Sequence, residues 1–409
     1  MALSLHSFGK KYLDSELLKP FLISVGLKIL ATISLAYIFM YEFEYKTDPQ
    51  VIFSESSLLT ERCLKHPEQI KDIFIHNTGS DMKYLDDPRT FILIKTCAVL
   101  NLFTCHNYWI NSLWMSCLCF VSIWYLIISI RKINPDFYIP ILLALLFVPT
   151  TLFWSSGLIK ETVSASMLCI LVVFLLKIYI NNNSFKYIVL SILPAYILYR
   201  IKFYALGGLL LVAIPVLVIR FIDNQKKLNP YFKTGIFLIL FIANYLILNS
   251  LCEYIFTVGI SDLIFYNYEA FVLHSKTDVL FEGLKEFEPS SFLPHLPAAL
   301  WHGLFMPLPW DGHSFFMYLE GIINLITLLS GSWLVFSILS NRNKTFSNNP
   351  VLTCIILFYI LISAICITLS TPNWGTLARY KVLYIPSFHF LLIFYLSKEA
   401  SLERILARF

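Results

Sequence analysis

The chain has 409 residues, of which 57% are hydrophobic and 14% are charged, and its mean hydropathy is +0.70. The apolar segments of the chain are too long for the core of a soluble protein, because several approach the roughly 20 residues that cross a bilayer as a helix. The composition therefore excludes an ordinary soluble protein and predicts an all-α, polytopic integral membrane protein, with residues 1–409 forming a single membrane domain. Basic anchors beside the spans account for the net charge of +5, so nucleic acid need not be invoked.

Residues 1–19 precede the first apolar run and carry Lys10, Lys11 and Lys19. No small-residue cleavage site follows them, so we expect a cytoplasmic tail and not a signal peptide. Windows of about 19 residues predict about ten spans. They lie near Phe21–Tyr41, Tyr108–Ile130, Phe137–Phe153, Val163–Ile180, Tyr187–Leu198, Tyr204–Ile222, Ile236–Phe256, Tyr318–Leu339, Val351–Leu369 and Leu383–Leu396.

This division of the chain places most loop Lys and Arg residues on one face, which the positive-inside rule identifies as the cytoplasmic one. They are Lys10, Lys11, Lys19, Arg131, Lys132, Lys177, Lys186, Lys226, Lys227, Lys233, Arg342, Lys344, Lys398, Arg404 and Arg408. Both termini are then cytoplasmic. Two large loops, about 42–107 and 257–317, lie on the outer face. The first includes Phe91–Thr104, an apolar stretch too short to span, which we expect to lie in the membrane interface or dip partly inward.

Three short basic segments are expected on the outer side, where positive charges should be few. They are Trp154–Glu161 with Lys160, Tyr199–Lys202 with Arg200 and Lys202, and Ala378–Lys381 with Arg379 and Lys381. Each alone is typical of a side chain that reaches from the membrane edge to the headgroups. Together they indicate an oxyanion site, because Arg suits bidentate phosphate recognition and Lys supplies a compact charge. The anion expected at that depth is the phosphate or diphosphate of a lipid-linked substrate.

Three sequence segments carry a resemblance to a known family. They are Pro149–Glu161, which contains Trp-Ser-Ser-Gly-Leu-Ile-Lys-Glu, Phe305–Trp310 followed by Glu320, and Asn373–Lys381. With the order of the spans, they resemble bacterial polytopic polymerases of O-antigen or capsule repeat units, and more distantly the multi-pass glycosyltransferases that use polyprenyl-linked donors. The resemblance implies that Lys160, Arg200 and Arg379 hold a polyprenyl diphosphate leaving group while an acceptor hydroxyl attacks the anomeric carbon. The chain departs from the multi-pass glycosyltransferase pattern because no acidic pair directly follows the first span.

The candidate site joins these cations to nearby carboxylates and loop residues. The candidate catalytic residues are Arg379, Lys160, Glu161 and Arg200, and the candidate substrate-binding residues are Lys202, Lys381, Asp86, Asp87, Arg89, His302, Trp310 and Asp311. Glu161, Asp86 or Asp87 could accept the hydroxyl proton. Glu161 could instead be a helix-start charge, and Asp86 and Asp87 a turn and N-cap.

The loop residues of the candidate site also have a second interpretation. His302 and His313, with Trp301, Trp310 and Asp311, could line a sugar pocket or act as proton carriers, or they could be only interfacial anchors and polar loop residues. No cofactor or metal is expected, since the chain has no P-loop, dinucleotide fingerprint or His-Glu-x-x-His motif. The expected partners are a polyprenyl-diphosphate-linked glycan, membrane lipid and polysaccharide-assembly proteins in a bacterial cytoplasmic membrane.

Two other classes of function stay open at this point. A transporter or flippase for lipid-linked sugars would also need an anion site. It should place ionisable groups near the bilayer midplane and contain broken helices in two related halves. An assembly subunit would instead use its outer loops to bind partners.

Overall fold

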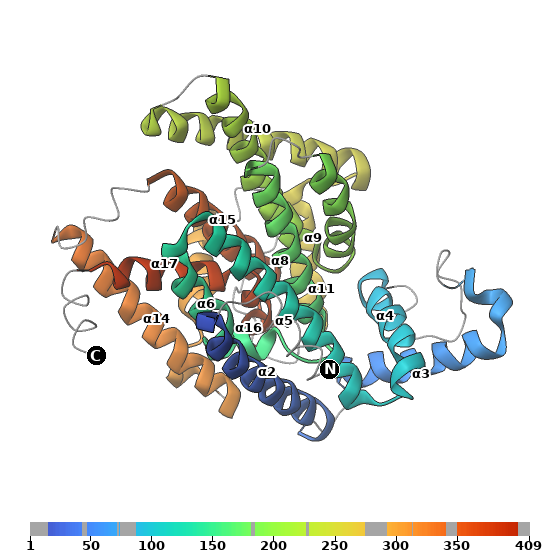
Figure 1. Ribbon diagram of the computed structural model, residues 1–409. Helices are drawn as coiled ribbons and strands as arrows, with labels where there is room; N and C mark the ends of the chain where they lie inside the picture. Colours follow the sequence, from blue (N-terminus) through green and yellow to red (C-terminus); the bar gives the residue numbers. More distant parts are fainter. Residues whose placement is uncertain are drawn as a thin grey trace. The chain divides into compact units, whose positions relative to one another are not determined.

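The computed structural model describes residues 15–42, 47–71, 73, 87–180, 185–225, 229–274, 293–312, 314–340 and 350–399. Every regular element in these ranges is a helix (Figure 1), which confirms the all-α expectation. Asp86 and His313 lie outside the described residues, as do Lys10 and Lys11 of the expected tail. The same holds for residues 275–292 of the second expected loop.

Seven described helices are long and apolar enough to cross a membrane. They are α2 (Ser15–Tyr41), α5 (Tyr108–Ile133), α8 (Lys160–Ile180), α9 (Phe185–Gln225), α10 (Pro230–Phe256), α14 (Phe315–Leu339) and α15 (Pro350–Ser370). An eighth candidate is a bent pair, in which Trp374–Leu383 and Ile385–Ser397 meet at 62°. The first part consists of α16 (Trp374–Tyr380) and η7 (Lys381–Leu383), and the second is α17 (Ile385–Ser397). The protein is therefore a polytopic helical membrane protein, with seven to eight candidate spans among the described residues.

One predicted span is divided in the structure, and the break predicted between two others is a kink. The expected span Phe137–Phe153 is divided into η3 (Pro135–Phe137), α6 (Tyr138–Leu146) and α7 (Pro149–Trp154). A residue before proline avoids the helical region, and Val148 accordingly adopts extended backbone angles before Pro149. The expected spans on either side of residues 199–203 both lie within α9, where two helices meet at a kink with non-helical backbone at Lys202, so this break falls in the interval that the sequence predicted.

The two expected outer loops contain helices of their own. The first holds α3 (Asp48–Lys65), η1 (Pro67–Gln69) and α4 (Pro88–Thr104), and α3 packs against α4. The second holds α11 (Ile260–His274), η4 (Leu293–His295), α13 (Leu296–Phe305) and η5 (Pro309–Asp311). Both regions therefore present ordered polar and aromatic side chains beside the spans.

The chain divides into two compact units. The first comprises Met1–Ser129, Leu145–Val173 and Leu193–Lys202, and the second comprises Ile130–Ala144, Phe174–Ile192 and Phe203–Phe409. In the first unit, Leu35 and Phe39 of α2 pack on Ile159, the residue before α8. In the second, one cluster joins Phe265 and Tyr268 of α11 to Ala299 of α13 and Leu369 of α15, while another joins α9 to α10.

Candidate functional site

The turn before α8 is fixed by polar contacts inside the first unit. Lys28 of α2 is only 3% exposed, and its ammonium donates to the Ser155 carbonyl at 2.6 Å and to the Ser155 hydroxyl at 2.7 Å. The backbone N–H of Gly157 donates to the Ser116 hydroxyl of α5 at 2.7 Å. Gly157 has a φ of +75°, a conformation that glycine adopts without steric cost. These contacts set the direction in which α8 begins.

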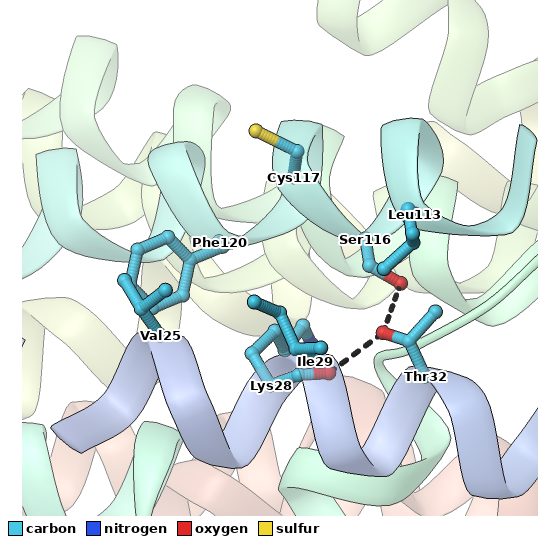
Figure 2. Close-up of a pocket in the computed structure, with 8 residues that line it drawn as sticks. All are labelled: Val25, Lys28, Ile29, Thr32, Leu113, Ser116, Cys117 and Phe120. Atoms are coloured by element: carbon cyan, nitrogen blue, oxygen red, sulfur yellow. Dashed lines mark hydrogen bonds between the residues drawn. The ribbon is translucent and has the colours of Figure 1, made fainter. Parts of the chain in front are cut away.

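A small cavity of about 10 Å³ lies beside Lys28, between α2 and α5 (Figure 2). The Thr32 hydroxyl donates to the Lys28 carbonyl at 2.7 Å and is hydrogen-bonded to the Ser116 hydroxyl at 2.8 Å. Space of this size holds about one water molecule. The cavity is too small for a sugar or a diphosphate, so we do not assign a substrate to it.

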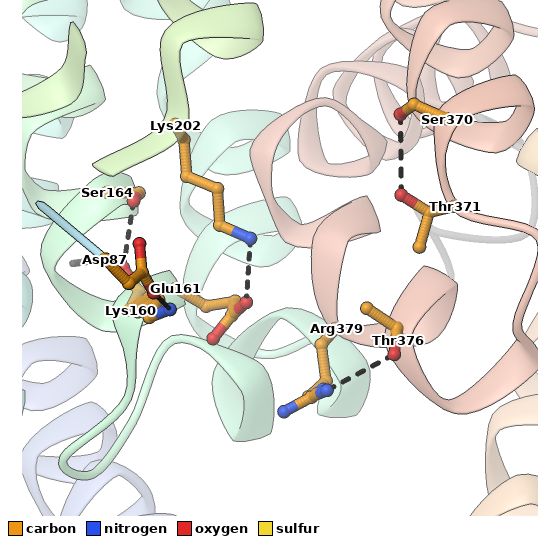
Figure 3. Close-up of polar contacts among 9 residues, drawn as sticks. All are labelled: Asp87, Lys160, Glu161, Ser164, Lys202, Ser370, Thr371, Thr376 and Arg379. Carbon is orange, nitrogen blue, oxygen red and sulfur yellow. Dashed lines mark hydrogen bonds and ion pairs between the residues drawn. The ribbon is translucent and has the colours of Figure 1, made fainter. Parts of the chain in front are cut away.

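A buried ion pair joins the start of α8 to the kink of α9. The Lys202 ammonium lies 3.1 Å from a Glu161 carboxylate oxygen, and the two side chains are 3% and 4% exposed (Figure 3). Lys202 is the residue whose backbone leaves the helical region, with a φ of −143° and a ψ of 68°. Two buried charges of opposite sign are tolerated far better together than either is alone. The pair therefore couples the direction of the kink to the start of α8.

Lys160 contacts a different carboxylate. Its ammonium lies 3.5 Å from Asp87, and both side chains are partly exposed (Figure 3). Asp87 caps α4 by accepting from the Arg89 backbone N–H at 3.1 Å, which confirms the N-cap interpretation. Burial raises the pKa of the Asp87 carboxyl, but Lys160 and the hydrogen bonds from Thr90 and Arg89 outweigh it, so that the pKa lies below its ordinary value.

Arg200 lies one helical turn from Tyr196 and is half-buried. Its guanidinium lies 6.0 Å from the centre of the Tyr196 ring and donates to the Tyr196 hydroxyl at 3.5 Å. The positive charge of Arg200 also affects Lys95 of α4. Burial is the larger cause and the charge of Arg200 the smaller, and both lower the pKa of the Lys95 ammonium. Lys95 was not among the candidate site residues. A lysine within an apolar stretch was the signal that could have identified it.

The third basic segment belongs to the second unit. Arg379 is half-buried in the last turn of α16, and its guanidinium donates to the Thr376 hydroxyl at 3.3 Å (Figure 3). Lys381 is only 1% exposed, and its ammonium donates to the Met306 carbonyl and interacts electrostatically with Glu320 of α14. Lys381 therefore holds the segment that follows α13, a contact that the sequence did not predict.

The loop residues of the second unit cluster around that segment. The His302 ring lies 5.3 Å from the Trp374 ring, and burial followed by the charge of Lys381 lowers the pKa of His302, against a smaller opposite effect of Asp311. Asp311 accepts from the Leu308 backbone N–H at 2.8 Å and so closes a turn. Trp310 is 70% exposed, which is typical of an aromatic residue at a membrane or ligand surface.

The structure thus unites two of the three basic segments. Glu161 and Lys202 link the Lys160 segment to the Arg200 segment within the first unit, and Asp87, which accepts from the Arg89 backbone N–H, lies beside Lys160. Arg379, Lys381, His302, Trp310 and Asp311 belong to the second unit. Among the described residues, no group of three or more His, Cys, Asp and Glu side chains is arranged to hold a metal ion.

Comparison of the chain with protein-family models, with curated proteins and with solved structures found no match.

Proposed function

We propose that this protein is a membrane glycosyltransferase of the polymerase type, which joins polyprenyl-diphosphate-linked sugar units at the outer face of a bacterial cytoplasmic membrane. The observation that carries the proposal is the buried Glu161–Lys202 pair. Lys160 directly precedes Glu161, and Arg200 lies two residues before Lys202. The pair therefore joins the two basic segments. Glu161 compensates the charge of Lys202 and Asp87 lies 3.5 Å from Lys160, so Arg200 is the member of the two segments that adds positive charge for an anion.

The chemistry that such a site supports is displacement of a diphosphate. The hydroxyl oxygen of the acceptor sugar forms a bond to the anomeric carbon of the donor, and the bond from that carbon to the diphosphate oxygen breaks. The electron pair leaves with the diphosphate, where preorganised cations stabilise the developing negative charge. Within the first unit, Lys160 and Arg200 have this role in the proposal, with Lys95 added because its pKa responds to the charge of Arg200. The role of Arg379, in the second unit, comes from the sequence resemblance alone.

The hydroxyl proton needs an acceptor, and the surroundings of the carboxylates favour Asp87. Glu161 is enclosed and paired with Lys202, whereas Asp87 is partly exposed beside Lys160. The lowered pKa of Asp87 makes its ionised carboxylate a weaker base than an ordinary aspartate, so its proposed role rests on its partly exposed position beside Lys160. Asp86 and Arg89 stay in the proposal as neighbours of this carboxylate. His302, Trp310 and Asp311 are the proposed sugar-contacting residues.

A second function is favoured by the second unit. The last candidate span is bent by 62°, and Lys381 at the end of its first part is enclosed together with Glu320. Broken helices and enclosed ionisable residues are typical of transporters. A transporter or flippase for lipid-linked sugars, or for another anion, is therefore the alternative.

A clean deletion in the organism that encodes the chain separates these functions. A polymerase defect leaves single lipid-linked units unpolymerised on the outer face of the membrane. A flippase defect leaves the same units on the cytoplasmic face, where glycan-degrading enzymes added to intact spheroplasts cannot reach them. Normal polymer in the deletion strain would contradict both proposals.

A further inference from the structure

Helix α4 presents an apolar face that the described residues of the first unit leave exposed. Val99, Leu102 and Phe103 are 44%, 53% and 79% exposed, and they lie on one side of the helix because residues three and four positions apart share a face. The only charged side chains in α4 are those of Arg89 and Lys95. An apolar, basic helix of this kind is typical of segments that lie in the boundary between lipid headgroups and acyl chains.

The neighbouring spans place α4 at the level of a membrane surface. Only residues 105–107 separate the end of α4 from Tyr108, where the candidate span α5 begins. Tyr41 at the end of α2 stacks on Trp109 at the start of α5, with ring centres 6.5 Å apart. Tyr and Trp concentrate at membrane–water interfaces, so this stacked pair marks the level at which both spans leave the bilayer.

A buried polar network holds α4 against its neighbours. The Asn111 amide of α5 donates to the Asn101 carbonyl oxygen at 2.6 Å, and the Thr104 hydroxyl donates to the Asn111 carbonyl oxygen at 2.6 Å. The Asn101 amide in turn donates to the Ser56 hydroxyl of α3 at 3.2 Å. Since buried polar groups are costly to separate, these bonds fix which side of α4 faces outward.

We propose that α4 is an interfacial helix whose outward face lies in the phospholipid leaflet where α5 begins. Val99, Leu102 and Phe103 contact acyl chains, and Lys95 lies at the depth of the lipid phosphates. This placement does not depend on whether the protein is a transferase or a transporter.

The test uses the full chain reconstituted in phosphatidylcholine and phosphatidylglycerol vesicles. A genetically encoded fluorescent amino acid replaces Phe103 in one variant and Glu61 in another. Glu61 is the matched control because it lies on the exposed side of α3, in the same helical hairpin, and pairs with Lys65 at the surface. Quenching by phospholipids brominated on their acyl chains and by aqueous iodide is measured for both positions.

We expect brominated lipid to quench the probe at position 103 at least about twofold more than the probe at position 61, with the order reversed for iodide. Stronger iodide quenching at position 103 would show a water-exposed face and overturn the proposal. Protection from both quenchers would show that a second copy or another protein covers α4, which also overturns it. Normal yield and a single gel-filtration peak for both variants ensure that the comparison concerns folded protein.

Discussion

At the scale of single residues, the first unit depends on polar side chains that fix backbone turns. Lys28 and Ser116 hold Ser155 and Gly157, and these contacts determine where α8 begins. The Trp-Ser-Ser-Gly-Leu-Ile-Lys-Glu segment stands out in the sequence, where its polar residues indicate part of an anion site. The sequence could not predict that they are bound by α2 and α5, because those partners lie about 40 to 130 residues away in the chain.

Replacement of Gly157 should destabilise the protein. A Cβ atom there would lie 2.9 Å from the Leu35 Cδ2 atom, and the φ of +75° is unfavourable for alanine. We expect Gly157→Ala to cost about 1–3 kcal/mol of unfolding free energy. Gly26→Ala is the control, since a Cβ atom at that helical position meets nothing within 4 Å. Thermal unfolding in detergent should show a lowered midpoint for Gly157→Ala alone, and equal midpoints for both variants would refute this account of the turn.

At the scale of elements, hydropathy predicted most helices but not their interruptions. Spans such as α5 and α15 follow directly from long apolar runs. The break at Val148 follows from Pro149, a signal that the hydropathy windows averaged away. The kink of α9 at Lys202 falls in the short interval that hydropathy leaves between two spans, but its partner Glu161 could not be predicted, because it lies 41 residues earlier. The N-cap role of Asp87 could be predicted, since the Asp-Pro sequence specifies it locally.

The link between α8 and α9 predicts strong coupling between Glu161 and Lys202. Glu161→Gln or Lys202→Met alone leaves one charge enclosed without its counter-charge, and each should cost about 3–5 kcal/mol. The double variant should cost clearly less than the sum. The exposed pair Glu61–Lys65 supplies the control, because removal of a surface pair costs about 0–1 kcal/mol. Additive losses for Glu161 and Lys202, measured by unfolding in detergent, would show that the pair does not join the two helices.

At the scale of the whole molecule, a basic residue near the end of a helix indicates which end of that helix faces the cytoplasm. Lys160 begins α8 and Lys177 lies in its last turn, while Tyr108 begins α5 and Arg131 lies near its end. Lys177 and Arg131 belong to the face assigned to the cytoplasm, so the starts of both helices should lie outside.

The expected topology has cytoplasmic termini, with residues Asp262 and Glu282 on the outer side. A cysteine introduced at either position, as Asp262→Cys or Glu282→Cys, should react with a membrane-impermeant thiol reagent in intact spheroplasts. A cysteine at Lys132 should react only after the membrane is opened. The wild-type protein has cysteines of its own, so its labelling under the same conditions gives the background. Labelling of position 282 only from the cytoplasmic side would overturn the assignment of the faces and the site built on it.

The most direct test of glycosyl transfer is polymerisation of purified lipid-linked units by the reconstituted protein. Arg379→Lys keeps the charge but removes the planar fork, so it should lower polymer formation about tenfold or more, and Arg379→Ala should lower it further. Lys160→Gln should also lower it, while Lys177→Gln at the other end of α8 should not. Polymer made by wild type and lost in this order is the predicted result. No polymer from wild type, or near-normal activity of both Arg379 variants at normal protein levels, would contradict the account.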